Sequence, residues 1–125
     1  MEDFIDDPRI QDGEVLYRRI APSQIKLEAG IPGISGSAFR TQQMSVNLAS
    51  RTTPQRVLER YPDHSLAAFT AGLARSLGCI VASDKDDPTH VLVCRKEDPS
   101  KSLTNSQAYN IAKQAKLIVF KVPSQ

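Results

Sequence analysis

Histidine and cysteine side chains are the first residues in this sequence that could do chemistry, because they are common metal ligands. The chain has two of each, His64, His90, Cys79 and Cys94. Their spacing matches neither C-x-x-C nor H-x-x-x-H, the patterns that bring two ligands to one ion. Each cysteine lies in a short apolar run, where a thiol commonly packs as a small hydrophobic group, and a disulfide would require the two runs to be neighbours. We therefore predict no metal site.

Serine and acidic side chains are the candidates for nucleophilic or acid–base catalysis. Ser35 has a glycine on each side, but Ile34 and Ser35 both stand between Gly33 and Gly36, so the G-x-S-x-G spacing fails. These glycines could form an anion-binding nest, although no phosphate-loop motif is present and a turn-rich connector is the favoured interpretation. The acidic residues of the hydrophilic loops are interpreted as solvated turn residues. No catalytic residue is predicted.

Arginine is concentrated in the first half of the chain, and this could indicate binding of phosphate groups. The residues are Arg18, Arg19, Arg40, Arg51, Arg56 and Arg60. If the fold gathers them, they form one basic patch, and nucleic-acid binding becomes an alternative function. Most aromatic residues fit a core rather than a stacking platform for bases. The simpler interpretation of Arg18 and Arg19 is that they lie on opposite faces of a strand and pair with acidic neighbours.

The tripeptide YRR at 17–19, together with the serine and threonine residues at 50–53, loosely resembles ADP-ribosyltransferases. In that family an early strand offers Arg or His to the nicotinamide dinucleotide, and a later Ser/Thr strand shapes the nicotinamide pocket. The residues that the resemblance implies are Arg18, Arg19, Ser50 and Thr52, with His90 nearby. The family's late-strand glutamate, which stabilises an oxocarbenium-like transition state, has no counterpart in the final LIVFKV. An enzyme that uses a nucleotide or NAD is a second alternative.

Four further segments resemble a family of small uncharacterised bacterial proteins. They are SGSAFR (35–40), MSVNLAS (44–50), FTAGLARSLG (69–78) and DPTHVLVC (87–94). The shared features are S-x-A-F, a strand that ends in L-A-S, and a D-P-x-H-x-L-V hairpin. The resemblance covers most of residues 13–94 and implies a bacterial, cytoplasmic protein, but it transfers no activity.

Composition and charge define the class of protein. With 125 residues, 40% hydrophobic and 24% charged, the chain has the size and composition of one globular domain. Residues 1–12 hold five carboxylates and one arginine, which leaves a net charge of +6 on residues 13–125. We therefore expect a flexible acidic leader at 1–12 followed by a single domain at 13–125. No secretory signal or membrane-spanning run is found, so a cytoplasmic location is expected.

The elements that must position the candidate residues follow from local patterns. Apolar alternation and β-branched runs predict strands at 13–20, 44–50, 79–83, 90–94 and 117–122, the third and fourth forming a hairpin. Helices are predicted at 54–60, 65–77 and 104–116, and a long shaped loop at 22–37. The fold class is α+β: one small domain, with a mixed or mostly antiparallel sheet of about five strands covered by two or three helices. The predicted core comprises Leu16, Val46, Leu48, Leu66, Phe69, Leu73, Leu77, Val81, Leu92, Ile111 and Ile118.

The first hypothesis for function is a non-catalytic protein-interaction module, an adaptor or regulatory subunit. A domain this compact has little room for a closed substrate pocket, and the sequence shows no convergent catalytic set. Binding would use the polar strand face at 47–53, the 22–37 loop, or both, with another protein as partner, no cofactor and no membrane. The candidate binding residues are Arg18, Arg19, Ser35, Ser37, Arg40, Asn47, Ser50, Thr52 and His90.

Overall fold

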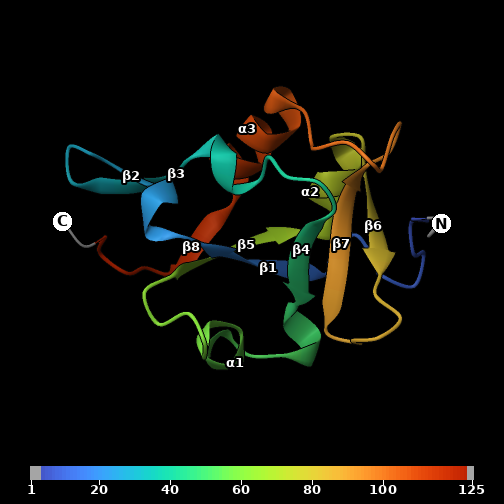
Figure 1. Ribbon diagram of the computed structural model, residues 1–125, viewed down its shortest axis with the longest axis horizontal. Helices are drawn as coiled ribbons and strands as arrows, with labels where there is room; N and C mark the ends of the chain where they lie inside the picture. Colours follow the sequence, from blue (N-terminus) through green and yellow to red (C-terminus); the bar gives the residue numbers. More distant parts are fainter. Residues whose placement is uncertain (1–3, 124–125) are drawn as a thin grey trace.

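The computed structural model describes residues 4–123, which form an antiparallel sheet, a small hairpin and three α-helices (Figure 1). The six-stranded sheet has the order β6-β7-β4-β1-β5-β8, and β2 pairs only with β3. The strands are β1 (Val15–Ile20), β2 (Ile25–Glu28), β3 (Ile31–Ile34), β4 (Met44–Leu48), β5 (Ser65–Thr70), β6 (Cys79–Ser83), β7 (His90–Arg95) and β8 (Lys116–Val119). The helices are α1 (Pro54–Leu58), α2 (Ala71–Ser76) and α3 (Asn105–Gln114). The α+β class is confirmed, with one strand more in the main sheet than predicted.

The two faces of the sheet carry different layers. The main core lies on the side of α2 and α3, where fully buried residues such as Leu16, Val93 and Ile111 meet. A smaller cluster on the other side packs α1 against the sheet through Val57 and Leu58. Figure 1 shows α3 above the sheet and α1 below it. No helix within residues 4–123 is long and apolar enough to cross a membrane.

The segment predicted as one helix at 65–77 is half strand and half helix, so that prediction is wrong for its first six residues. Ser65–Thr70 pairs with β1 along its whole length and with β8 on its other side. The Thr70 hydroxyl then accepts the Leu73 amide at 3.1 Å and starts α2. Both faces of β5 are covered, because Phe69 belongs to the main core and Leu66 to the smaller cluster. A strand buried on both faces has a continuous apolar run, which local periodicity does not distinguish from a helix.

The region predicted as a loop at 22–37 contains the β2–β3 hairpin, so this prediction is also wrong in part. Ile25 pairs with Ile34, and the register continues to the turn at Ala29-Gly30. Both turn residues have positive φ, 52° and 77°, as a tight two-residue hairpin turn requires. Alanine at this position gives no sequence signal for such a turn, since glycine and asparagine are the usual residues there.

The remaining elements follow the sequence prediction more closely. Thr104 and Gln107 form the predicted capping box of α3, and Thr53 caps α1. The β6–β7 hairpin is antiparallel, as expected. The predicted core is confirmed except that Leu73, Leu77 and Leu92 are only partly buried and Ile118 is 44% exposed.

The two cysteines are buried free thiols on these neighbouring strands. The register pairs Cys79 with Arg95 and Cys94 with Ile80. Because adjacent pairs along a strand point to opposite faces, the two sulfur atoms are directed away from each other. Burial raises the pKa of each thiol to about 11, so neither is a reactive thiolate at neutral pH.

Residues 4–12, which we call the N-terminal segment, pack against α2 and β6, in contrast to the flexible leader expected from the sequence. The Asp7 amide donates to the Val81 carbonyl at 2.8 Å, and the Asp6 carboxylate accepts the Val81 amide at 2.8 Å. Ile10 is 5% exposed and joins the main core. The segment therefore occupies the outer edge of β6, while residues 1–3 lie outside the described part of the chain.

The Asp7→Asn substitution tests how the N-terminal segment depends on pH. The Asp7 carboxylate accepts bonds from the Arg9 guanidinium, the Ser83 hydroxyl and the Arg9 amide, and these hold its pKa well below the usual range. The unfolded chain takes up this proton at the ordinary pKa near 4, before the native state does. The stability that Asp7 contributes is therefore complete above about pH 5 and is lost as the pH falls through 4 and below.

We expect Asp7→Asn to lower the free energy of unfolding by about 1–2 kcal/mol at neutral pH, because the carboxylate's charged hydrogen bonds are lost. Urea unfolding at several pH values should show this difference shrinking below about pH 4. The exposed Asp86 supplies the control Asp86→Asn, for which little change is expected. A difference that is constant from neutral to acidic pH would contradict this account of Asp7.

Candidate functional site

Arg18 has a structural environment. It lies in β1 on the core side, with Leu16 and Ile20, and its guanidinium donates to the Ala38 carbonyl at 3.1 Å and the Ser45 carbonyl at 2.9 Å. Burial, followed by the charge of Arg19, lowers the pKa of Arg18 to about 10, so it stays charged at neutral pH. The side chain thus ties β1 to β4 and to the 3-10 turn Gly36–Ala38. Its two bonds to internal carbonyls leave it a poor candidate for binding phosphate.

Arg19 points to the opposite face of the sheet, as strand alternation requires. Its guanidinium lies over the Tyr61 ring, 4.1 Å from the centroid, which is a cation–π contact. The Tyr61 ring is in turn 5.1 Å from the ring of His64. Arg18 and Arg19 therefore lie on opposite faces of β1, as the simpler interpretation predicted, but their contacts are backbone carbonyls and an aromatic ring and not acidic side chains.

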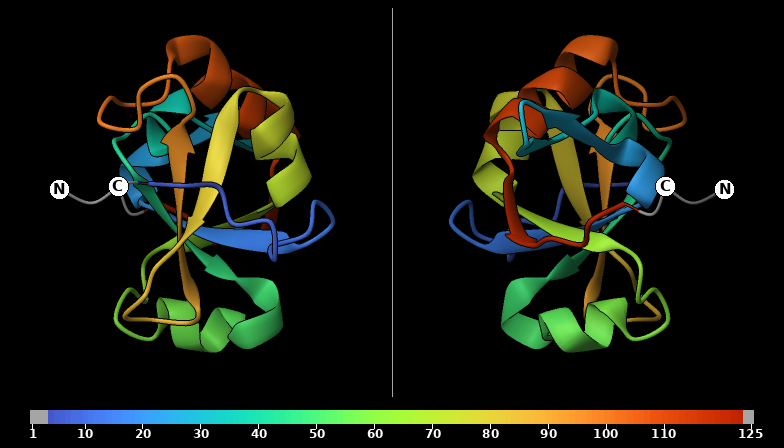
Figure 2. Two further views of the ribbon diagram at one scale, coloured as in Figure 1. Left: turned by 90° about the vertical axis from the view of Figure 1, so that its right-hand side faces the viewer. Right: turned by 90° about the vertical axis from the view of Figure 1, so that its left-hand side faces the viewer.

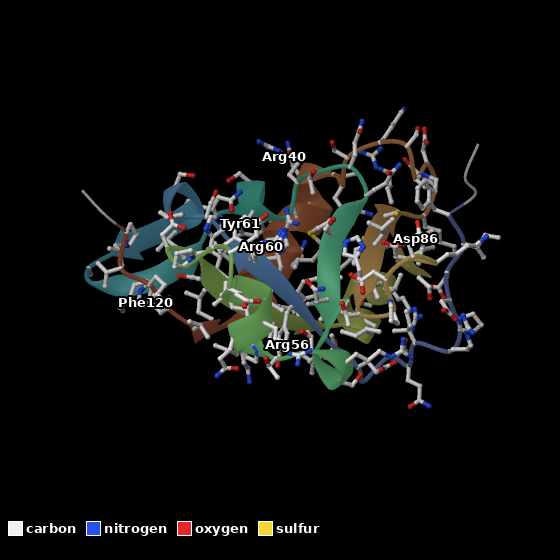
Figure 3. All side chains as sticks on the ribbon, turned by 60° about the horizontal axis from the view of Figure 1, so that its bottom comes forward. Arg40, Arg56, Arg60, Tyr61, Asp86 and Phe120 are labelled. Carbon is white, nitrogen blue, oxygen red and sulfur yellow. The ribbon has the colours of Figure 1, made fainter. Side chains whose placement is uncertain are left out.

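The six arginines of the first half of the chain do not form one patch. Arg18 is bonded to internal carbonyls, and Arg51 donates to the Pro88 carbonyl at 2.8 Å. Arg40 lies on the α3 side of the sheet, whereas Arg56 and Arg60 lie on or just after α1. In Figure 3, Arg60 lies beside Tyr61, and Arg56 lies well apart from Arg40. The expected single basic surface is therefore divided between two sides of the molecule.

The polar residues predicted at the end of β4 make internal bonds. Asn47 and His90 are paired neighbours in β4 and β7, and the Asn47 side-chain amide contacts the Thr89 hydroxyl at 3.4 Å. His90 Nδ1 is 2.7 Å from the Asp84 carboxylate. The hydroxyl of Ser50 donates to Glu14 at 3.4 Å. Thr52 ends the 3-10 turn Ala49–Arg51 and is half-buried. Asn47 and His90 are thus adjacent, but these bonds organise the β4–β7 end of the sheet and do not define a pocket.

Three other predicted residues are brought together. Ser35, Ser37 and Arg40 line a surface depression of about 260 Å³ that the start of α3 completes. The two serine hydroxyls share a hydrogen bond of 2.9 Å, and Arg40 Nη1 donates to the Asn105 side-chain oxygen at 2.9 Å. Tyr109 supplies another wall. We call this depression the Ser35–Arg40 pocket.

A second depression, of about 470 Å³, lies on the other side of the start of α3. Its lining includes Arg95, Lys96, Glu97 and Gln107. Arg95 donates twice to the Ser102 carbonyl and contacts Glu97 at 3.5 Å. Arg95 therefore already has a carboxylate partner, and the depression, which also includes Lys96, has mixed charge.

The free edge of β8 is the other unusual surface. The sheet order leaves one side of this strand without a neighbour in the described residues. Three apolar residues at alternate positions, Ile118, Phe120 and Val122, are exposed by 44%, 38% and 74%. The Lys121 amide donates to the buried Ser65 hydroxyl at 2.9 Å, so the chain still follows β5 after β8 ends. Nearby, at the same end of the molecule, the β2–β3 hairpin exposes Leu27 and Ile31 (Figures 1 and 2).

Sequence reasoning missed Asn105 and Tyr109 in the pocket and the exposed apolar row at β8. One signal was present, because residues 105–125 contain three lysines and no carboxylate side chain. The position of β8 at the edge of the sheet was not visible from its own apolar residues. No cluster of three or more potential metal ligands occurs in the described part of the chain.

Comparisons with known proteins do not add a family. The chain matches no protein-family model, no curated protein and no solved structure at a significant level.

Proposed function

We propose that this protein is a non-catalytic protein-binding module, an adaptor or regulatory subunit, whose partner adds an extended acidic segment to the free edge of β8. The difference between the two edges of the six-stranded sheet carries this proposal. The β6 edge is occupied by the N-terminal segment, through the bonds of Asp6 and Asp7 to Val81. The β8 edge has no such cover in residues 4–123. An uncovered edge offers unpaired backbone groups to a strand of another chain.

The side chains at this edge favour a protein partner. Natural edge strands often carry charges that prevent pairing, and β8 begins with Lys116, but Ile118, Phe120 and Val122 form an exposed apolar row with period two. In strand addition the backbone hydrogen bonds give affinity, and alternate side chains of the added strand would pack against this apolar row. The exposed Leu27 and Ile31 of the β2–β3 hairpin enlarge the apolar surface at this end. The hairpin belongs to the region 22–37 that the sequence suggested for binding.

The charge of the region supports an acidic partner segment. Lys113 and Lys116 are exposed and flank the start of β8, and Lys121 follows its end. Asp63 lies near Lys121, whose ammonium donates to the Pro62 carbonyl at 2.8 Å. No Asp or Glu occurs from residue 105 onward, so Lys113 and Lys116 supply most of the positive charge at this edge. Complementary charge speeds association and orients the incoming chain. By contrast, the polar face at 47–53 has its side chains engaged with Glu14, Pro88 and Thr89.

For the compartment we propose the bacterial cytoplasm. Both cysteines of the chain are free, buried thiols, and a chain without a disulfide is typical of a reducing compartment. The segments that resemble small bacterial proteins support the bacterial origin.

The test replaces one exposed apolar residue at each end of the molecule. Ile118→Lys places an added charge on the free edge, and Ile5→Lys does the same at the N-terminal segment, where Ile5 is 72% exposed. Both proteins should fold with stability within about 0.5 kcal/mol of the parent.

A photo-reactive residue at position 118 should cross-link one specific protein in the native cytoplasm. Ile118→Lys should reduce the amount of that partner retained by the chain at least about tenfold.

Further measurements distinguish strand addition from other contacts. In the purified complex, amide exchange should slow along β8, and the cross-linked partner segment should be acidic. Ile5→Lys should leave retention unchanged, while raising the salt concentration should weaken it. The proposal fails if no specific protein is cross-linked at position 118, or if the complex survives Ile118→Lys.

A further inference from the structure

We propose that the Ser35–Arg40 pocket binds a phosphate group, and this inference does not depend on the β8 edge. The pocket is built from two parts of the chain that are far apart in sequence. Residues 35–40 form one side, and Asn105, Ala108 and Tyr109 of α3 form the other. Gly36 lies next to α3, since a Cβ built on it would be in ordinary van der Waals contact, 3.8 Å, with the backbone of Tyr109.

The charge of Arg40 is not neutralised within the pocket. Its guanidinium donates to Asn105 Oδ1, which is a neutral acceptor, and Arg40 is an exposed residue. No carboxylate lines the pocket. Arg9 and Arg75 differ, because Arg9 is bonded to Asp7 and Arg75 to Asp6 and Asp12. The bond to Asn105 thus positions a cation without cancelling its charge.

The other polar groups of the pocket are mainly hydrogen-bond donors. A guanidinium has five N–H groups, and one of those on Arg40 is used by Asn105. The Ser35–Ser37 pair has two hydroxyl protons, of which the shared bond uses one. The side-chain amide of Asn105 keeps two N–H donors while its oxygen accepts from Arg40. Donors around one fixed cation suit an oxyanion with several acceptor oxygens.

Size and shape narrow the ligand class further. A volume of about 260 Å³ lies just below the usual range for drug-sized ligands, so the pocket suits a phosphate group on a short linker or the free anion. Arginine recognises phosphate through a planar fork of N–H donors, and serine hydroxyls complete such sites. Tyr109 also lines the depression and is 62% exposed. The organic group attached to the phosphate would extend past this residue into solvent.

The experiment titrates the purified full chain with inorganic phosphate, with a capped phosphoserine and with adenosine monophosphate, at constant ionic strength. Amide resonances of residues 35–40 and 105–109 should shift saturably with at least one probe. The tightest of the three identifies the source of the phosphate: free anion, modified side chain or nucleotide. Acetate, which has one charge and two oxygens, should bind more weakly than phosphate.

Two substitutions test the role of Arg40. Arg40→Gln keeps an N–H donor for Asn105 but removes the charge, and we expect affinity to fall at least about tenfold. Arg56→Gln is the matched control, because Arg56 is an exposed arginine on the α1 side and its loss should change affinity less than about twofold. Both positions are exposed, so both variants should keep the parent's melting temperature.

Three results would overturn the proposal. The first is an absence of saturable shifts in the pocket up to about 10 mM of any probe. The second is equal weakening by Arg40→Gln and Arg56→Gln, which would indicate attraction by overall charge. The third is saturable binding that Arg40→Gln leaves unchanged. None of these results affects the β8 proposal, whose substitutions lie outside the pocket.

Discussion

Replacing Phe69 with alanine should lower the free energy of unfolding by about 3–5 kcal/mol, the largest single effect that we expect in this protein. Phe69 is 5% exposed and lies in β5, between β1 and β8. Its ring meets the fully buried ring of Phe39 edge to face, with centroids 5.9 Å apart and an interplanar angle of 89°. Removing it leaves a cavity in the core and also ends this aromatic contact, which is favourable beyond its area alone.

Thermal and urea unfolding measure this effect. A loss of this size should lower the melting temperature by roughly 10–20 °C in a domain of this length. Phe120→Ala is the control, because Phe120 is 38% exposed and should change stability by less than about 1 kcal/mol. If Phe69→Ala unfolds at the parent's temperature, the Phe69 side chain is not buried in the main core.

Replacing Arg75 with methionine should destabilise the protein by about 2–3 kcal/mol and release the N-terminal segment. Its guanidinium donates to Asp6 at 3.0 Å, to Asp12 at 2.8 Å and to the Asp7 carbonyl at 2.9 Å. Methionine keeps most of the apolar stem and removes all three bonds. Two of the acceptors are carboxylates, so their charges lose a partner at the same time.

A backbone contact beside Arg75 holds the same part of the N-terminal segment. The amide of Gly72, in α2, donates to the Asp12 carbonyl at 2.8 Å. A Cβ on Gly72 would lie 2.9 Å from the Asp12 side chain, so the two backbones meet without space between them. Arg75→Met removes the three hydrogen bonds of the guanidinium. The Gly72–Asp12 hydrogen bond then holds this part of the segment with fewer partners.

Amide exchange and urea unfolding test this prediction together. In Arg75→Met, the Val81 amide, which donates to Asp6, should exchange faster than in the parent. Arg56→Met serves as control, because this exposed arginine should change neither stability nor exchange beyond about 0.5 kcal/mol. Unchanged protection of Val81 in Arg75→Met would show that Arg75 does not anchor the segment.

Local chemistry in the sequence was enough for several elements. The capping box of Thr104 and Gln107 marked the start of α3, and Thr53 followed by Pro54 marked α1. The two β-branched runs separated by a turn marked the β6–β7 hairpin. These predictions held because a helix cap or a short turn depends on residues within a few positions of one another.

The errors arose where distant segments decide the structure. The apolar spacing from Leu66 onward fits a helix, but pairing with β1 and β8 makes Ser65–Thr70 a strand. Residues 4–12 look like a solvated acidic leader until α2 provides Arg75 to bind their carboxylates. In both cases the decisive contacts are made by residues far away in the sequence, which a local pattern does not contain.

The candidate sites also depend partly on local sequence and partly on contacts between distant segments. Sequence alone pointed to Ser35, Ser37 and Arg40 as polar groups near one another in the chain. The tertiary structure decided that Asn105, 65 positions after Arg40, orients its guanidinium, and that Arg18 is occupied by internal carbonyls. It also decided that Ile118 lies on a free edge and not in the core. Residue types determine which bonds a side chain can make, whereas the pairing of strands determines which partners it meets and which edge remains open.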